Sequence, residues 1–217
     1  MKCVVTAGPT FETLDQVRRL TNFSTGRLGA ELANFLTERS HQVTLLLGEQ
    51  ATYAGALNAT RVERFTTTAD LSAKLQTLAK QNVEAVFHAT AVSDFKFGKV
   101  WSRDAFGELS EITSGKFSTR QGTLLAELVP TPKIISSLRD WFPTSRLVGW
   151  KYEVDGDHAS VLKSAREQIE TCRTNACVAN GLAYGKNFGI LASDGKLTEA
   201  RGSADLFTAL EQFILHR

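Results

Sequence analysis

Residues 22–30, with the sequence Asn-Phe-Ser-Thr-Gly-Arg-Leu-Gly-Ala, have the residue types and spacing of a phosphate-binding segment. Gly26 and Gly29 flank a basic residue, and two hydroxyl residues beginning at Ser24 precede them. The segment leads into residues 27–38, whose apolar periodicity predicts a helix. Backbone N–H groups at a helix N-terminus are unpaired, and the helix dipole favours negative charge there. Phosphate is therefore the expected ligand.

The glycine spacing matches neither the dinucleotide fingerprint G-x-G-x-x-G nor the P-loop. The connection before it, residues 7–21, is also longer than the tight first turn of a standard dehydrogenase. The local sequence also allows two purely structural interpretations. Gly26 and Gly29 would also permit close packing of a helix on a sheet, and Asn22 would equally serve as a helix N-cap.

The composition sets the class of protein. The 217 residues suit one domain, 1–217, and the apolar and charged fractions, 42% and 22%, are ordinary for a globular chain. A net charge of +2 without basic runs predicts no nucleic-acid partner, and the apolar stretches are too short to predict a membrane span. The sequence opens directly on a predicted strand, which favours a cytoplasmic protein.

The three cysteines are an odd number and form no C-x-x-C motif. No histidine stands in a recognisable pairing with any of them as a catalytic base. We interpret Cys3, Cys172 and Cys177 as reduced, buried thiols, and we expect no metal site in the protein itself.

Apolar strands alternate with amphipathic helices along the first half of the chain. Strands are expected at 2–6, 42–47, 61–66 and 84–89, and helices at 27–38 and 70–80. This alternation predicts an α/β fold with a doubly wound, mostly parallel, Rossmann-like sheet covered on both faces.

The second half is less regular. Residues 95–108 have no periodicity and are expected to form a mobile loop, and 108–112 and 123–129 are expected to pair as a small antiparallel extension. A helix should begin near Pro130 and Pro132 and run through Trp141. Further strands are expected at 147–151, 176–179, 188–192 and 196–198, and helices at 159–172 and 203–215.

Ligands of wound sheets bind outside the carboxyl ends of the strands. Four informative segments follow predicted strands: 7–10, 90–94, 149–151 and Asn180. We therefore expect them to converge at one edge of the sheet.

Local sequence leaves the role of several residues open. Asp94 would suit a turn, and Trp150 would suit either the core or a platform for a flat base. Lys116 is expected to be solvated unless its loop closes over the site. Arg18 and Arg19 are either solvated or placed to contact an anionic ligand.

Four motifs resemble those of the phosphopantothenate–cysteine ligase family. They are residues 5–10 (V-T-A-G-P-T), 22–30 (N-F-S-T-G-R-L-G-A), 91–95 (A-V-S-D-F) and 178–180 (V-A-N), and the similarity runs from Val4 to Phe213. The resemblance implies a Rossmann-like fold and a homodimer. It implies that the carboxylate of 4′-phosphopantothenate attacks the α-phosphate of a nucleoside triphosphate, whose charge Mg²⁺ would screen. The amine of cysteine then displaces the nucleotide.

The same resemblance implies roles for individual residues. Asn22 would bind the acyl intermediate at its carbonyl, and Lys116 would neutralise charge as that intermediate forms. The remaining residues would bind the nucleotide or the acid: Gly8, Ser24, Gly26, Gly29, Trp150 and Asn180 the nucleotide, and Thr90, Ala91 and Asp94 the acid substrate or the nucleotide sugar. Arg18 is expected to bind the anionic substrate because of its place on the loop that leads to the phosphate-binding segment.

The chain departs from the bacterial pattern in ways that favour ATP over CTP. The loop at 116–119 keeps only the first lysine of K-x-K-K, and residues 167–172 have no counterpart of the lysines in enzymes that use CTP. Phe11 stands where bacterial members have arginine, which bears on anion affinity. No flavin is expected.

Three alternatives to this ligase remain at this level. A nicotinamide-dependent reductase would require a Tyr-x-x-x-Lys pair, which Tyr53, Tyr152 and Tyr184 do not form. A non-catalytic nucleotide-binding relative is favoured by the small number of cationic residues at the expected site. An acyl-adenylating ligase with another substrate is also compatible with the sequence.

Overall fold

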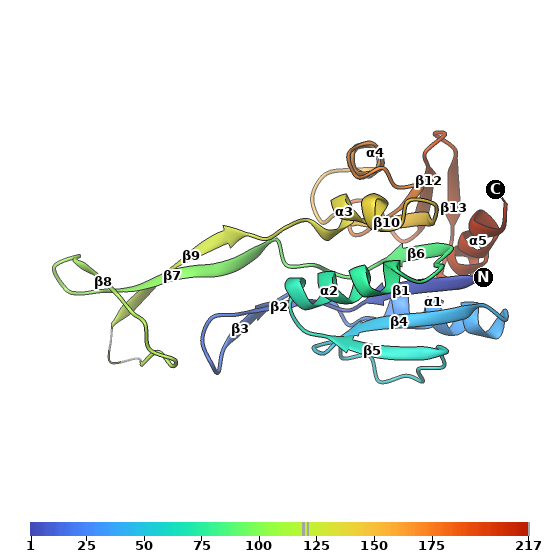
Figure 1. Cartoon of the computed structure of the whole chain (residues 1–217). Helices are drawn as coiled ribbons and strands as arrows, with labels where there is room; N and C mark the ends of the chain where they lie inside the picture. The colour runs from blue at the N-terminus through green and yellow to red at the C-terminus, as the bar shows by residue number, and fades with distance from the viewer. Residues whose placement is uncertain (119, 121, 217) are drawn as a thin grey trace.

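A computed structural model describes residues 1–118, 120 and 122–216. Its centre is an eight-stranded sheet in the order β13-β12-β11-β10-β6-β1-β4-β5 (Figure 1). The strands are β1 (Lys2–Ala7), β4 (Gln42–Gly48), β5 (Arg61–Phe65), β6 (Ala85–His88), β10 (Arg146–Tyr152), β11 (Ala176–Asn180), β12 (Phe188–Ala192) and β13 (Leu197–Ala200). From β5 to β11 all neighbours are parallel, and β12 and β13 are antiparallel.

The parallel part has the strand order of a doubly wound dinucleotide-binding sheet. The predicted Rossmann-like α/β fold is confirmed. Its buried strands are nearly continuous runs of apolar residues because helices cover both faces.

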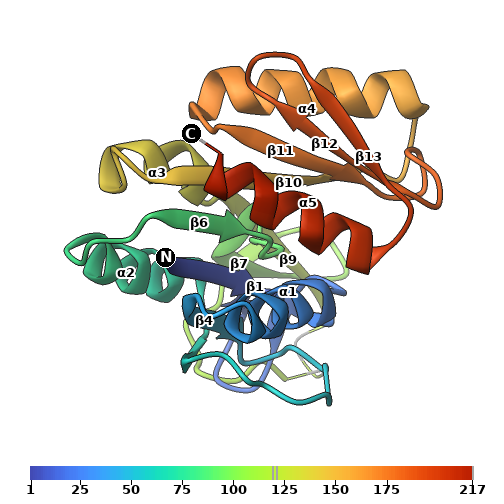
Figure 2. The same ribbon diagram turned by 90° about the vertical axis from the view of Figure 1, so that its right-hand side faces the viewer.

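In the described part of the chain, five helices cover the sheet: α1 (Arg27–Glu38), α2 (Thr68–Ala79), α3 (Ile134–Trp141), α4 (His158–Cys172) and α5 (Ser203–Leu215). Helices α1 and α5 pack on one face, and α2, α3 and α4 cover the other (Figure 2). All five were predicted, with ends that differ by a few residues at most. Cys3, Cys172 and Cys177 are buried free thiols, as predicted.

A three-stranded antiparallel sheet extends away from the main sheet and is called the arm below (Figure 1). It consists of β7 (Phe95–Arg103), β8 (Leu109–Glu111) and β9 (Thr123–Pro130), with β7 in the middle. Two predictions were therefore wrong. Residues 95–103 form a strand and not a mobile loop, and the strands near 108–112 and 123–129 pair with β7 and not with each other. Solvent reaches both faces of the arm, so its residues show no apolar alternation.

The long connection after β1 contains a hairpin of β2 (Phe11–Thr13) and β3 (Arg19–Thr21). This hairpin points in the same direction as the arm (Figure 1). Phe11 is buried beneath the Arg19 guanidinium, whose carbon lies 4.7 Å from the ring centroid. Phe11 therefore has a packing role in place of an anion contact.

Among the described residues, no helix combines the length and apolar character needed to cross a membrane.

Candidate functional site

A cavity of about 870 Å³ opens at the carboxyl edge of the parallel strands. Its walls come from the ends of β1, β6, β10 and β11 and from the first turns of α1 and α3. The structure brings together every residue proposed for the site except Arg18 and Lys116: Gly8, Asn22, Ser24, Gly26, Gly29, Thr90, Ala91, Asp94, Trp150 and Asn180. The expected convergence at one edge is confirmed.

The N-terminus of α1 forms one end of this cavity. Gly26 is the N-cap residue with φ +79° and has no side chain to cap the helix, and no acidic residue lies in the first turn. The Arg27 N–H donates to the Thr25 hydroxyl oxygen at 3.3 Å, which leaves the next two N–H groups of α1 without a side-chain acceptor among the described residues. A Cβ atom on Gly29 would lie 2.6 Å from the Ala7 Cβ atom, so this glycine lets α1 approach β1 closely. The packing and phosphate-binding interpretations therefore hold together. Close packing places the uncapped N–H groups at the cavity, where an anion would be stabilised.

Asn22 lines the cavity and is not the N-cap of α1. Its Nδ2 atom donates a hydrogen bond to the Ala91 carbonyl oxygen at 3.2 Å. The Ala91 N–H in turn donates to the Gly8 carbonyl oxygen at 3.1 Å. These bonds tie the Asn22 amide to the ends of both β1 and β6.

Three polar side-chain atoms on cavity-lining residues are shielded from solvent and have no partner in the described part of the chain. They are the hydroxyl oxygen of Thr90, the indole nitrogen of Trp150 and the amide oxygen of Asn180. Leaving such a group unsatisfied costs about 1–3 kcal/mol. Three such groups on residues that line one cavity mark it as a candidate functional site. Trp150 also packs against the core, as its alternative interpretation predicted.

The charged groups of the cavity include one carboxylate. Asp94 is exposed, and no described residue forms an ion pair with it. Arg27 and Lys151 are paired with Glu31 at 2.7 Å and Glu153 at 3.1 Å.

Lys133 contributes a further cation, at the N-cap of α3, and it forms no ion pair with a described residue. Lys133 was not among the residues predicted for the site from the sequence. The signal was its position directly before a helix at the carboxyl edge of the sheet.

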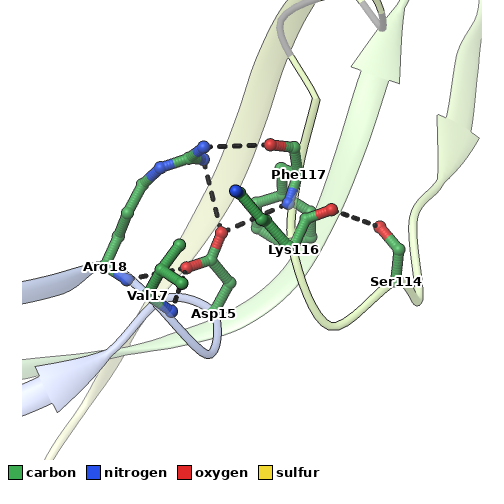
Figure 3. A network of polar contacts seen from close by, with 6 residues as sticks. All are labelled: Asp15, Val17, Arg18, Ser114, Lys116 and Phe117. Atoms are coloured by element: carbon green, nitrogen blue, oxygen red, sulfur yellow. Dashed lines mark hydrogen bonds and ion pairs between the residues drawn. The ribbon is translucent and has the colours of Figure 1, made fainter.

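Arg18 and Lys116 lie outside the cavity, at a contact between the β2–β3 hairpin and the arm (Figure 3). The Asp15 carboxylate accepts hydrogen bonds from the N–H groups of Val17 (2.9 Å), Arg18 (2.7 Å) and Phe117 (3.2 Å). The Arg18 guanidinium lies 3.3 Å from this carboxylate and donates to the Phe117 carbonyl oxygen at 2.9 Å. We call this network of Asp15, Arg18 and residues 115–117 the Asp15 latch. The Gln16 N–H also donates to the Gly115 carbonyl oxygen at 3.0 Å, so the backbone on both sides of Lys116 is held against the hairpin.

The pKa of Asp15 lies below its ordinary value. Burial of the carboxylate acts to raise the pKa, but the N–H donors of Val17, Phe117 and Arg18 and the charge of Arg18 together outweigh burial. A lowered pKa in the folded state means that the latch is strongest above the ordinary value of 3.8 and weakens as the pH falls below it.

We expect Asp15→Asn to release the latch. The amide keeps the shape of the carboxylate but offers a weaker acceptor and no charge for Arg18. Hydrogen exchange at residues 115–117 should become several-fold faster at pH 7. The matched control is Asp104→Asn, because Asp104 also accepts two backbone N–H groups, from Phe106 and Glu108, at the tip of the arm. Unchanged exchange at 115–117 would show that other contacts hold this segment.

Comparisons with known proteins identify relatives of this chain. The bifunctional coenzyme A biosynthesis protein CoaBC of Thermococcus kodakarensis is 34% identical over 185 residues, which are 85% of this chain and 42% of that protein. The phosphopantothenate–cysteine ligase of Mus musculus is 32% identical over 141 residues, 62% of this chain and 42% of that protein. This chain thus spans less than half the length of either relative.

A crystal structure supports the likeness in three dimensions. The DNA/pantothenate metabolism flavoprotein from Streptococcus pneumoniae superposes with a TM-score of 0.86 at 26% identity, over 99% of this chain and 98% of that one. The family profile described as "DNA/pantothenate metabolism flavoprotein C-terminal domain" matches residues 1–211. The chain therefore belongs to the family of the DNA/pantothenate metabolism flavoprotein C-terminal domain.

Proposed function

We propose that this protein is a phosphopantothenate–cysteine ligase of coenzyme A biosynthesis. The observation that carries the proposal is the cavity itself, where the uncapped N-terminus of α1, the Asn22 amide and the unsatisfied groups of Thr90, Trp150 and Asn180 meet. The name of the mouse relative supports this reaction, and the name of the Thermococcus relative supports a role in coenzyme A biosynthesis.

The first step would form an acyl nucleotide. The carboxylate of 4′-phosphopantothenate attacks the α-phosphorus of the triphosphate, the bond to the β-phosphate oxygen breaks, and pyrophosphate leaves. The N–H groups at the start of α1, with Ser24, would bind the phosphates, and Trp150 and Asn180 would contact the base or sugar. The residues act by positioning the reactants and stabilising charge.

The second step would form the amide. The cysteine amine attacks the acyl carbonyl, the bond to the nucleotide phosphate oxygen breaks, and the nucleoside monophosphate leaves with its electron pair, while the proton lost from the amine nitrogen passes to water. Asn22 would donate to the acyl carbonyl oxygen, since its Nδ2 group already points at the ends of β1 and β6.

We propose ATP as the favoured nucleotide over CTP, with Mg²⁺ bound to its phosphates. No cluster of three metal-binding side chains occurs in residues 1–118, 120 and 122–216. Mg²⁺ commonly keeps several waters and binds through phosphates and one or two carboxylates, so the Asp94 carboxylate fits such an ion. Its chemistry would be to neutralise the triphosphate. That the reaction needs no flavin, and that the protein is cytoplasmic, remain predictions.

Lys116 keeps its proposed role of neutralising charge only if the segment 114–117 moves. The Asp15 latch holds this segment outside the cavity, so release of the latch would have to precede any contact between Lys116 and the nucleotide bound there.

We also propose a homodimer. Large apolar side chains are exposed on the arm, which is the part of the molecule farthest from the main core. They are Phe95, Phe106, Leu109, Leu125 and Leu128. A second copy that covers them would remove this apolar surface from water. Sedimentation equilibrium of the protein decides between monomer and dimer.

The function is tested by pyrophosphate release with 4′-phosphopantothenate and cysteine, run in parallel with ATP and CTP. We expect pyrophosphate release that requires phosphopantothenate, together with formation of its cysteine amide. The nucleotide that gives the higher rate is the energy source. If neither nucleotide supports pyrophosphate release, although the protein is folded and still binds one of them, the result would favour the non-catalytic relative. The position of Arg18 and Lys116 outside the cavity is the observation that supports this second candidate.

A further inference from the structure

His88 lines the cavity, and it has no role in the reaction proposed above. It is the last residue of β6 and only 5% exposed. Neighbouring residues of a strand point to opposite faces of a sheet. Because Phe87 packs with α1, His88 shares the opposite face with Val86, which packs with α3. Its ring therefore lies on the α3 side of the cavity.

The hydrogen bonds around Thr6 fix the proton on the His88 ring. The Thr6 hydroxyl oxygen lies 2.9 Å from His88 Nδ1 and accepts a hydrogen bond from the Thr90 N–H at 3.3 Å. Thr6 is fully buried, and Nδ1 is the one acceptor within reach of its hydroxyl proton among the described residues. The hydroxyl therefore donates to Nδ1, and a neutral ring with Nδ1 unprotonated carries its proton on Nε2.

The ring is also neutral at physiological pH, since burial lowers the pKa of His88 to about 4. Nε2 has no hydrogen-bond partner among the described residues. The side chain thus presents a neutral N–H donor to the cavity. A donor of this kind pairs with an oxygen acceptor and leaves the charge of the site unchanged.

The surroundings of His88 favour an oxygen that carries negative charge. Helix α3 begins on the same side of the cavity without a side-chain cap, and Lys133 is its N-cap residue. Gly149 on β10 is the register partner of His88. Because Gly149 has no side chain, the side chains of Gln168 and Ile135 pack directly against it and line the cavity there. The lining of the cavity on the α3 side therefore includes a cation, a helix N-terminus and the His88 N–H group.

We propose that His88 is a further substrate-binding residue whose Nε2–H group donates a hydrogen bond to a carboxylate or carbonyl oxygen bound between β6 and the first turn of α3. This inference rests on the proposed ligase function for the identity of its ligand. Two substrates supply such an oxygen: 4′-phosphopantothenate and cysteine. The nucleotide phosphates belong to the other side of the cavity, at α1.

The first test reads the ring directly and needs no turnover. In protein labelled with ¹⁵N-histidine, we expect the His88 signals of a neutral ring protonated at Nε2. Addition of 4′-phosphopantothenate or of cysteine, each alone, should shift the Nε2–H signal, and the one that shifts it identifies the source of the oxygen. A non-hydrolysable ATP analogue alone should leave it in place. A ring protonated at Nδ1, or a signal that moves only with the nucleotide, would overturn the proposal.

Two variants separate this contact from packing. His88→Gln keeps an N–H donor near the position of Nε2, whereas His88→Leu fills space without a donor. We expect the dissociation constant of the ligand that shifts His88 to rise about tenfold in His88→Leu and to recover largely in His88→Gln. Nucleotide affinity should change less than twofold in both. Equal losses in the two variants, or a loss of nucleotide affinity of the same size, would assign His88 to packing. These are binding measurements, so they remain decisive even if no pyrophosphate is released.

Discussion

Asn22→Asp should separate the two half-reactions, with pyrophosphate released once and the amide product reduced at least about a hundredfold. The Asn22 Nδ2 group donates to the Ala91 carbonyl oxygen at 3.2 Å and faces the cavity. A carboxylate in its place has no proton to donate, and it repels both this carbonyl and the oxygen that becomes negative when cysteine attacks. The first step would depend on the proposed phosphate-binding N–H groups at the start of α1, here called the phosphate cradle, which this substitution leaves in place.

The measurement is a rapid-quench experiment that follows pyrophosphate and product with one equivalent of nucleotide. A burst of pyrophosphate with accumulating acyl nucleotide is expected. The matched control is Asn34→Asp, because Asn34 also donates to a backbone carbonyl, that of Ala56 at 2.8 Å, but does not line the cavity. If Asn22→Asp turns over like the wild type, the role given to Asn22 is wrong.

The sheet and the place of the cavity were predictable because they follow from burial and topology. Near-continuous apolar strands separated by amphipathic helices determine a parallel sheet, and its carboxyl edge collects whatever follows the strands. Gly8, Ala91, Trp150 and Asn180 come from four different strand ends, yet the structure places all four at one cavity.

The arm was not predictable by the same reasoning. Most residues of β9 are exposed, as are those of β8, so no alternation of buried and exposed residues marks these strands. Arg18 and Lys116 could not be placed from sequence for the same reason. Their positions depend on how the hairpin and the arm meet, and that contact rests on the backbone hydrogen bonds of the Asp15 latch.

His88 and Lys133 were missed for a different reason. Each has one polar group at the end of an apolar strand or at the start of a helix, a pattern that is common in proteins without a site. His88 becomes informative only when the Thr6 hydroxyl is seen to occupy Nδ1, which leaves Nε2 for the cavity. Such hydrogen-bond accounting requires coordinates.

Gly29→Ala should weaken nucleotide binding and stability together, because it separates α1 from β1. Alanine is the better helix former, by about 1 kcal/mol. Against this gain, the new Cβ atom would lie 2.6 Å from the Ala7 Cβ atom and 3.2 Å from the Thr6 carbonyl oxygen. Overpacking of this kind costs about 1–3 kcal/mol, so the steric cost should exceed the propensity gain. Relief requires α1 to move outward and to carry its uncapped N–H groups away from the phosphates.

The size of that movement decides the functional effect, since a displacement of about 1 Å at a positioning element can cost about a hundredfold in rate. We expect calorimetry to show weaker nucleotide binding and denaturant unfolding to show lower stability in Gly29→Ala. Gly202→Ala is the matched control: Gly202 is the N-cap of α5, its φ of 179° suits any residue, and no atom lies within 4 Å of an added Cβ. If Gly29→Ala lowers stability but binds nucleotide as the wild type does, close packing of α1 on β1 is not what positions the phosphate cradle. The glycine would then serve the core alone, and nucleotide affinity would have to come from Trp150, Asn180 and the groups around Asn22.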